Sequence, residues 1–383
     1  MENPTDNDSR QLRVVISGGG TGGHIFPAVS IANAVRALRP DAQVLFVGAQ
    51  GRMEMQRVPA AGYEIVGLPI QGFDRKHLWK NISLPWKMWK SDREVRRVLK
   101  SFRPQVAVGV GGYASFPTLS AAQKMGIPTL IQEQNSFAGK ANILLGKRAD
   151  VVCVAFEGME RFFPAERLML TGNPVRQSLL ASEVTRKDAL ASFGLEEGRK
   201  TVLIVGGSLG ARTLNESVLA HLDEIAQSGV QFIWQTGRFY SAAIAAELER
   251  RGRPGRLVVT DFISDMAAAY KAADLVISRA GASSVSEFCL TGKPVIMVPS
   301  PNVTEDHQTK NALSLVNRDA ALYVKDAEAP QTLLPLALKT VADDALLARL
   351  SANVLKMALP DSAAIIAGEV VRLAEGRERK QEQ

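Results

Sequence analysis

Two segments of this 383-residue chain carry the same pattern: a short apolar run, a turn rich in glycine, and a stretch with helical periodicity. The first turn spans Gly18–Gly23 and the second spans Gly206–Ala211. A buried strand that enters a helix through glycines exposes backbone N–H groups, and the positive end of the helix dipole, to an anion. Because the two turns lie almost half a chain apart, we expect two domains facing each other with a phosphate-bearing ligand between them.

Apolar runs alternate with helical stretches along the whole chain, which predicts an α/β protein built from βαβ units and parallel sheets. The apolar share of 46% is ordinary for a soluble globular protein, and the length is sufficient for two cores. We place the domain boundary at Gly172–Arg176, because an Asn before Pro disfavours a helix. Strands are expected at 12–17, 43–48, 64–68, 106–110, 128–132, 151–154, 168–170, 201–205, 231–235, 257–259, 274–278, 295–298 and 321–323.

The first glycine turn also fits the GxGxxG fingerprint of dinucleotide-binding folds. A nicotinamide site usually adds an acidic residue at the end of the next strand, about 20 residues further on. Here that strand, Val44–Gly48, ends in Ala49 and Gln50, so a dinucleotide site is disfavoured. Neither turn continues as GK[ST], which excludes a P-loop.

Polar residues follow three of the predicted strands in the first half. His24 should lie in the first turn of a helix, where the helix N-terminus keeps an imidazole neutral and able to accept a proton. Tyr113 and Glu133 follow two later strands, at positions that favour function over packing. A local capping role for His24, and an ordinary loop at 132–135, remain open alternatives.

In the second half, Ser278–Glu287 is again a strand, a glycine turn and the start of a helix. Glu287 is a candidate acceptor for a ribose diol, with the serine-rich turn near phosphates. Ser284 and Glu287 also have the spacing of a capping box, so a structural explanation stays open. The segment Asp306–Asn311 follows another strand and is a candidate sugar contact.

A basic, tryptophan-rich segment spans residues 73–103. Its ten basic and three acidic side chains account for the whole net charge of +7. Trp79, Trp86 and Trp89 lie in it, and tryptophan with lysine on an apolar surface suits an anionic lipid headgroup layer. The alternative is an ordinary helix with a solvated basic face. Nucleic acid is a weaker candidate, because no nucleic-acid-binding motif accompanies the segment.

The two cysteines, Cys153 and Cys289, stand far apart, so we expect small buried hydrophobic residues and no disulfide or zinc site. The polar, acidic start does not resemble a signal peptide, and no apolar stretch reaches the ~18 residues of a membrane-spanning helix. From these features we expect a cytoplasmic protein.

Taken together, the motifs resemble the bacterial peptidoglycan N-acetylglucosaminyltransferases of glycosyltransferase family 28. The resemblance runs from about residue 12 to 370 and rests on eight segments in order: GGGTGGHIFP, GVGGYASFP, QEQNSFAG, GNPVR, GGSLGA, DFISDMAAAY, SRAGASSVSE and DHQTKNA. It implies a GT-B fold, in which two Rossmann-like domains face each other across a cleft. Residues 11–172 would form the acceptor and membrane-associating domain, and 176–358 the UDP-N-acetylglucosamine domain. The helix at 359–376 would pack back on the first domain.

The resemblance also implies an activity: inverting transfer of N-acetylglucosamine from UDP-N-acetylglucosamine to the C4 hydroxyl of the muramoyl pentapeptide of lipid I, giving lipid II. No metal or other cofactor is expected. The acceptor would be met at the cytoplasmic face of the anionic inner membrane, by a peripheral protein that can have other cell-wall synthesis proteins as partners. No nucleic-acid partner is expected.

The same resemblance assigns site residues. His24 or Glu133 would be the base, and Tyr113 would lie in the acceptor region. The donor would meet Thr21, Gly22, Gly23, Asn135, Arg176, Ser208, Ile263, Ala282, Ser283, Ser284, Val285, Ser286, Glu287 and Gln308. Two alternatives remain: a UDP-N-acetylglucosamine 2-epimerase, which would have no use for the tryptophan-rich segment, and a non-catalytic, lipid-recruited sensor of nucleotide sugars.

Overall fold

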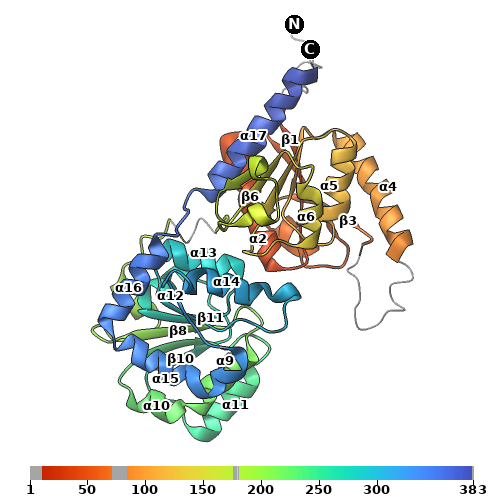
Figure 1. Ribbon diagram of the computed structural model, residues 1–383. Helices are drawn as coiled ribbons and strands as arrows, with labels where there is room; N and C mark the ends of the chain where they lie inside the picture. Colours follow the sequence, from red (N-terminus) through yellow and green to blue (C-terminus); the bar gives the residue numbers. More distant parts are fainter. Residues whose placement is uncertain (1–10, 71–83, 176–178, 180, 382–383) are drawn as a thin grey trace. The chain divides into compact units, whose positions relative to one another are not determined.

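Parallel β-sheets form the centres of both halves of the chain in the computed structural model, which describes residues 11–70, 84–175, 179 and 181–381 (Figure 1). The chain divides into two units. The N-terminal unit consists of Met1–Val175 and Pro360–Gln383, and the C-terminal unit of Arg176–Leu359. Within the described residues, each of the thirteen predicted strands is present and its ends lie within one residue of the prediction. The predicted class of two parallel-sheet α/β domains is therefore confirmed.

The N-terminal sheet has the strand order β3-β2-β1-β4-β5-β6-β7, with every neighbouring pair parallel. The central strand β1 pairs with β2 on one side and β4 on the other, so that Ile16 lies opposite both Phe46 and Val108. The strands are β1 (Arg13–Ser17), β2 (Gln43–Ala49), β3 (Glu64–Leu68), β4 (Val106–Gly109), β5 (Thr129–Glu133), β6 (Val151–Val154) and β7 (Leu168–Leu170).

Both faces of this sheet are covered, which explains why its strands read as continuous apolar runs. Side chains alternate across a strand, so Val14 and Ile16 pack toward α2 and α17 while Val15 packs toward α4 and α5. Ile366 and Val370 of α17 belong to the same core as Val14, which ties the last helix to this unit. The helices are α2 (Gly22–Leu38), α3 (Glu54–Ala60), α4 (Leu84–Phe102), α5 (Ser115–Lys124), α6 (Lys140–Gly146) and α17 (Ser362–Gln381), with short 3₁₀ turns η2 (Met159–Arg161) and η3 (Ala165–Arg167).

The C-terminal sheet has the order β10-β9-β8-β11-β12-β13, again parallel throughout. Its core packs Val202 and Ile204 of the central strand against Phe232 and Trp234. The indole of Trp234 donates to Asn215 Oδ1 at 2.9 Å, so its one polar atom is satisfied. The strands are β8 (Thr201–Val205), β9 (Gln231–Gln235), β10 (Leu257–Thr260), β11 (Leu275–Ser278), β12 (Val295–Met297) and β13 (Leu322–Tyr323).

Helices connect these strands in the manner of a doubly wound sheet. Several begin within a few residues of a strand end, which brings their N-termini to the carboxyl edge of the sheet. The elements are α8 (Arg186–Ser192), α9 (Arg212–Ala220), α10 (Leu222–Gln227), α11 (Ser241–Arg251), α12 (Met266–Ala272), α13 (Ala282–Thr291), η4 (Thr304–Asp306), α14 (His307–Val316), η5 (Asp326–Glu328), α15 (Ala329–Val341) and α16 (Asp344–Leu355).

Both cysteines are buried, Cys153 on β6 and Cys289 on α13, as predicted. Burial raises the pKa of each thiol to about 12, so neither is a reactive thiolate near neutral pH. Among the described residues, no helix combines the length and apolar character needed to cross a lipid bilayer.

Candidate active site

Three predicted site residues of the N-terminal unit follow neighbouring strands. His24 comes after β1, Tyr113 after β4 and Glu133 at the end of β5, and the sheet order places β1, β4 and β5 side by side. The carboxyl ends of parallel strands share one edge, so the topology gathers these residues there. Tyr113 is exposed, and the Arg52 guanidinium lies 5.7 Å from the centre of its ring.

The first glycine turn packs backbone against backbone on the loop after β4. Gly19 N donates to Gly111 O at 3.2 Å. Gly112 has a φ of +91°, and a Cβ there would lie 2.4 Å from Gly19 O. Glycine is therefore required at this contact between the two loops, whatever ligand the turn meets.

His24 lies in the first turn of α2, as predicted, and is half-buried. Its Nδ1 lies 3.0 Å from Gly19 O and 3.3 Å from Thr21 Oγ1. A carbonyl oxygen can only accept, so the hydrogen resides on Nδ1, and a neutral ring then carries its lone pair on Nε2. Nε2 faces the Cα of Gly111, where a Cβ would lie 2.9 Å away. This arrangement suits a general base at Nε2.

Glu133 is engaged differently, being only 2% exposed. Its Oε1 accepts from Asn135 N at 3.1 Å, and its Oε2 accepts from Gly139 N at 3.1 Å and Asn142 Nδ2 at 2.8 Å. These bonds fold the loop 134–139 around the carboxylate and hold the backbone of Asn135. The contacts are those of a residue that shapes a loop, so the geometry favours His24 over Glu133 as the base.

A network of buried side-chain amides, which the sequence did not predict, joins the carboxyl ends of β4 and β5 to Asn173, near the end of the first part of the N-terminal unit. Gln132 Nε2 donates to Asn173 Oδ1 at 2.9 Å, and Asn173 Nδ2 donates to Gln134 O at 3.0 Å. Gln134 Nε2 also donates to Val110 O at 2.9 Å. The network therefore fixes the strand ends of β4 and β5 relative to the segment that leads out of the unit.

Glu54, at the start of α3, is a second residue that the sequence did not indicate as part of the site. Its side chain is only 1% exposed. Its Oε2 accepts from Gly20 N at 2.8 Å, and its Oε1 accepts from Ala49 N at 3.0 Å. As the sequence shows, Ala49 and Gln50 place no carboxylate at the end of β2. The carboxylate of Glu54, four residues after Gln50, nevertheless contacts this strand end through its bond to Ala49 N. Both of its oxygens accept from backbone amides, whereas the acidic residue of a dinucleotide site binds a ribose hydroxyl.

In the C-terminal unit, Ser208 lies exposed in the turn after β8. Gln235, a buried residue at the end of β9, donates from Nε2 to Gly207 O at 2.8 Å and to Asp261 O at 3.1 Å. It thereby joins the turn that carries Ser208 to the loop that carries Ile263. The side chain of Ile263 is buried, so any ligand contact there uses its backbone.

Helix α13 begins at Ala282, with Gly281 as a cap residue that offers no side-chain hydrogen bond. Ser284 is therefore already inside the helix, and the capping box considered for Ser284 and Glu287 does not form. The first turn of this helix carries the positive end of the helix dipole, which favours a nearby anion. The side chain of Val285 is buried in the core, while Ala282, Ser283, Ser284, Ser286 and Glu287 are partly exposed.

Glu287 lines a hollow of about 400 Å³ together with Ser264 and Asp265. Its Oε2 accepts a hydrogen bond from the Tyr270 hydroxyl at 2.7 Å. Tyr270 is buried, so it fixes the orientation of the carboxylate. Tyr270 was not predicted as a site residue, although it lies in the DFISDMAAAY motif.

Gln308 stands in the first turn of α14, where its Oε1 accepts from Ser300 N at 2.8 Å. The two residues before this helix, Glu305 and Asp306, have φ values of +58° and +52°. Consecutive left-handed residues that are not glycine store backbone strain, and such strain concentrates at functional sites. The buried Asn311 donates to Ala280 O at 3.2 Å and connects α14 to the loop before α13.

The predicted lipid-facing segment is described only in part. On α4, Trp86 and Trp89 are 59% and 60% exposed, whereas Val95 and Leu99 are buried. Lys90 Nζ lies 5.3 Å from the Trp86 ring centre, and the Arg93 guanidinium 5.8 Å from that of Trp89. Trp79 lies outside the described residues, as does Arg176.

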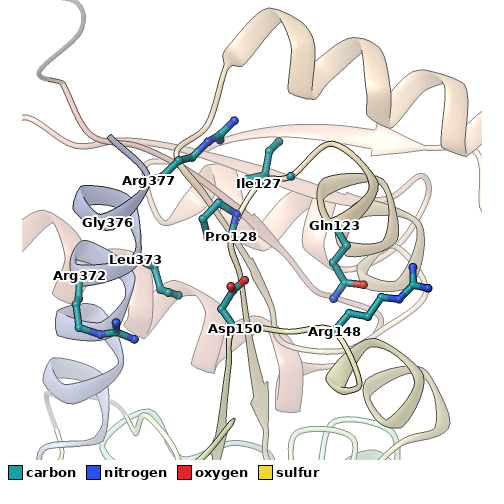
Figure 2. Close-up of a pocket in the computed structure, with 10 residues that line it drawn as sticks. Gln123, Ile127, Pro128, Arg148, Asp150, Arg372, Leu373, Gly376 and Arg377 are labelled. Atoms are coloured by element: carbon teal, nitrogen blue, oxygen red, sulfur yellow. The ribbon is translucent and has the colours of Figure 1, made fainter. Parts of the chain in front are cut away.

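Another hollow, of about 720 Å³, lies in the N-terminal unit between α17 and the loops that precede β5 and β6 (Figure 2). Arg148, Arg372 and Arg377 line it with Asp150. It lies near the amino ends of β5 and β6, and none of the predicted site residues lines it. The described residues contain no group of three or more His, Cys, Asp or Glu arranged to hold a metal ion.

Comparison with known proteins covers both units. The glycosyltransferase family 28 N-terminal domain matches residues 14–154, and the family's C-terminal domain matches 201–364. A Bacteroides fragilis protein named UDP-N-acetylglucosamine--N-acetylmuramyl-(pentapeptide) pyrophosphoryl-undecaprenol N-acetylglucosamine transferase is 62% identical, over 98% of this chain and 99% of its own. The protein of the same name from Bacteroides thetaiotaomicron is 63% identical, over 96% and 99%. The crystal structure of Acinetobacter baumannii MurG aligns with a TM-score of 0.75 at 31% identity, covering 94% of this chain and 99% of that one.

Proposed function

The chain belongs to glycosyltransferase family 28 and is a glycosyltransferase, and from this premise we propose its reaction and its site. It transfers N-acetylglucosamine from UDP-N-acetylglucosamine to the C4 hydroxyl of the muramoyl pentapeptide of undecaprenyl-pyrophosphate-linked lipid I. The product is lipid II, the precursor of peptidoglycan. The observation that carries this proposal is the near-full-length identity to transferases named for that reaction.

We assign the general base to His24. Nε2 takes the proton of the C4 hydroxyl while that oxygen attacks the anomeric carbon of N-acetylglucosamine from the face opposite UDP. The new O–C1 bond forms as the bond from C1 to the β-phosphate oxygen breaks, so the configuration inverts and UDP carries away the electron pair. A positioned base of this kind contributes typically ~10²–10⁴-fold to the rate.

The donor is assigned mainly to the C-terminal unit. The amides of the Gly206–Ala211 turn and the positive dipole end at the start of α13 would stabilise the charge that develops on UDP, with Arg176 as a cation. Glu287, held by Tyr270, would accept hydrogen bonds from the ribose diol. Thr21, Gly22, Gly23 and Asn135 of the N-terminal unit, and Gln308 with Ser208 and Ile263, complete the assigned donor set.

We further propose that the protein works as a peripheral enzyme on the anionic cytoplasmic face of the inner membrane, where α4 makes the contact. Two exposed tryptophans flanked by Lys90 and Arg93 support this assignment, because aromatic rings and basic groups both favour the headgroup layer. Contacts with other cell-wall synthesis proteins are part of the same hypothesis.

The test is a transfer assay with radiolabelled UDP-N-acetylglucosamine and a short-chain lipid acceptor analogue. We expect label in the lipid product, and release of UDP only when the acceptor is present. Formation of the manno epimer from UDP-N-acetylglucosamine alone would instead identify a 2-epimerase. Binding of the nucleotide sugar with no acceptor-dependent UDP release would identify a sensor.

A further inference from the structure

Glu54 and His24 are joined through a single peptide group. The N–H of Gly20 donates to Glu54 Oε2 at 2.8 Å, and the C=O of the same peptide, which belongs to Gly19, lies 3.0 Å from His24 Nδ1. In a trans peptide the N–H and C=O point in opposite directions, so one planar unit lies between the carboxylate and the imidazole. The hydrogen-bond chain therefore runs from Nδ1–H to Gly19 O, and from Gly20 N–H to the carboxylate.

The backbone around Glu54 is shaped to admit its side chain. A Cβ at Gly19 would lie 2.3 Å from Glu54 Cδ, and a Cβ at Gly48 would lie 2.6 Å from its Cγ. Two glycines thus leave the space that the side chain fills. Because a buried carboxylate is costly unless its oxygens are satisfied, the amides of Gly20 and Ala49 make this position tenable.

From this geometry we propose that Glu54 is a positioning residue for the transfer reaction, acting on His24 through the Gly19–Gly20 peptide. The carboxylate polarises that peptide, which makes Gly19 O a stronger acceptor and holds Nδ1–H toward it. Nε2, on the side of the ring that faces Gly111, is thereby kept as the basic nitrogen, as in a carboxylate–histidine pair with a peptide inserted between the partners. Glu54 also occupies the Gly20 amide, where a ligand anion would bind in a nucleotide-binding turn.

This inference rests on the proposed role of His24 as the base, and its test separates the two. The first measurement is the ¹⁵N spectrum of the histidine rings. The chain has four histidines, so the signals of His24 are identified by their loss in His24→Gln. We expect the Nδ1–H tautomer in the wild-type protein and a mixture of tautomers in Glu54→Gln. An Nε2–H ring in the wild-type protein, or an unchanged ring in Glu54→Gln, overturns the proposal.

The second measurement is turnover. Because small displacements of a catalytic group cost up to about 100-fold, we expect Glu54→Gln to lower kcat by about 10- to 100-fold and to change the KM for UDP-N-acetylglucosamine by less than about threefold. Gly19→Ala, whose methyl group must displace the carboxylate, should reproduce the loss if Glu54→Gln does not fold. Glu64→Gln, an exposed carboxylate on β3, is the matched control and should keep wild-type turnover.

The third measurement is chemical rescue. Truncation in Glu54→Ala removes a group equivalent to acetate, so added acetate should raise the kcat of this variant at least about fivefold, a fraction of the ~100-fold at stake. Acetate should leave the wild-type protein and Glu64→Gln unchanged. Turnover of Glu54→Gln and Gly19→Ala within about twofold of wild type would contradict the proposal. Absence of transfer by the wild-type protein would instead remove the proposed function, while the ring spectra still report on the relay.

Discussion

The two glycine turns look alike as sequence but differ in what occupies their backbone amides. In the first, the amide of Gly20 is taken by the carboxylate of Glu54, and the carbonyl of Gly19 receives His24. In the second, the side-chain amide of Gln235 donates to Gly207 O, and the backbone N–H of Arg238 donates to Ser208 O. Within the described part of the chain, the N–H groups of Gly207, Ser208 and Leu209 donate to no protein acceptor. A protein anion thus occupies the Gly20 amide of the first turn, while these amides of the second turn remain open to a ligand anion.

The difference shows that a glycine turn after a strand indicates, first of all, that another group packs closely against its backbone. That group can be part of the protein and need not be a ligand phosphate. In the N-terminal unit the close approach is that of a side-chain carboxylate and of the neighbouring Gly111–Gly112 loop. In the C-terminal unit Gly210 and Gly237 make the close contact, since a Cβ on Gly237 would lie 2.1 Å from Gly210 Cα. The open amides lie just before that contact.

Removal of the His24 side chain, directly after the first of the two turns, should have the largest effect on the rate of transfer. We expect His24→Ala to lower kcat by about 10²- to 10⁴-fold with little change in the affinity for UDP-N-acetylglucosamine, since the ring is assigned to proton transfer. Single-turnover kinetics and calorimetric titration of the nucleotide sugar measure the two quantities. An unchanged kcat would eliminate His24 as the base.

Two control variants sharpen this result. His221 has its Nδ1 2.9 Å from Ser217 O, so its ring is likewise held by a backbone carbonyl, and His221→Ala should keep wild-type turnover. Glu133→Gln removes a loop-shaping carboxylate, so we expect it to lower Tm by several degrees while the folded fraction retains most of its kcat. A loss of kcat in Glu133→Gln comparable to that in His24→Ala, at unchanged Tm, would return the base to Glu133.

Glu287 tests the donor site assigned to the C-terminal unit, which also contains the second glycine turn. Hydrogen bonds to charged groups contribute about 1.5–3 kcal/mol, so Glu287→Gln should weaken binding of UDP-N-acetylglucosamine by about 10- to 100-fold while kcat at saturation changes little. Tyr270→Phe should give a smaller change in the same direction, because it releases the carboxylate without removing it. An affinity within twofold of wild type in Glu287→Gln would remove this residue from the donor site.

The smallest expected effect concerns the membrane surface of the N-terminal unit. Changing Trp79, Trp86 and Trp89 together to alanine should weaken sedimentation with anionic vesicles by about tenfold, because partial burial of the two exposed α4 rings contributes on the order of 1–2 kcal/mol. Tm should not change for the α4 positions, whose rings are exposed. Phe239→Ala, which removes a 79% exposed ring from the C-terminal unit, is the matched control. Undiminished vesicle binding by the triple variant would contradict the assignment of this surface.

The fold could be predicted from the sequence because both sheets bury their two faces. Strands such as Val202–Ile204 are then uninterrupted apolar runs, and the helices between them have a different period. The ends of these runs also located His24 and the Gly206–Ala211 turn, since residues that follow parallel strands share one edge of the sheet.

The parts of the site that could not be predicted depend on contacts between residues distant in sequence. Glu54 reads as an ordinary acidic residue at a helix start, and only the structure shows that it reaches Gly20, 34 positions earlier. Asn173 and Gln132 likewise meet across 41 positions. The spacing of Ser284 and Glu287 suggested a capping box, but the helix begins two residues earlier, at Ala282, because Gly281 already occupies the cap position.

The central claim is that the Gly20 amide of the first turn is held by a protein carboxylate, while the Gly207 amide of the second turn is open to the donor. It can be tested directly by titrating UDP into ¹⁵N-glycine-labelled protein. We predict that the amide signal of Gly207 shifts progressively with UDP, while that of Gly20, already bonded to Glu54, stays in place. A shift of the Gly20 signal with no change at Gly207 would contradict the account.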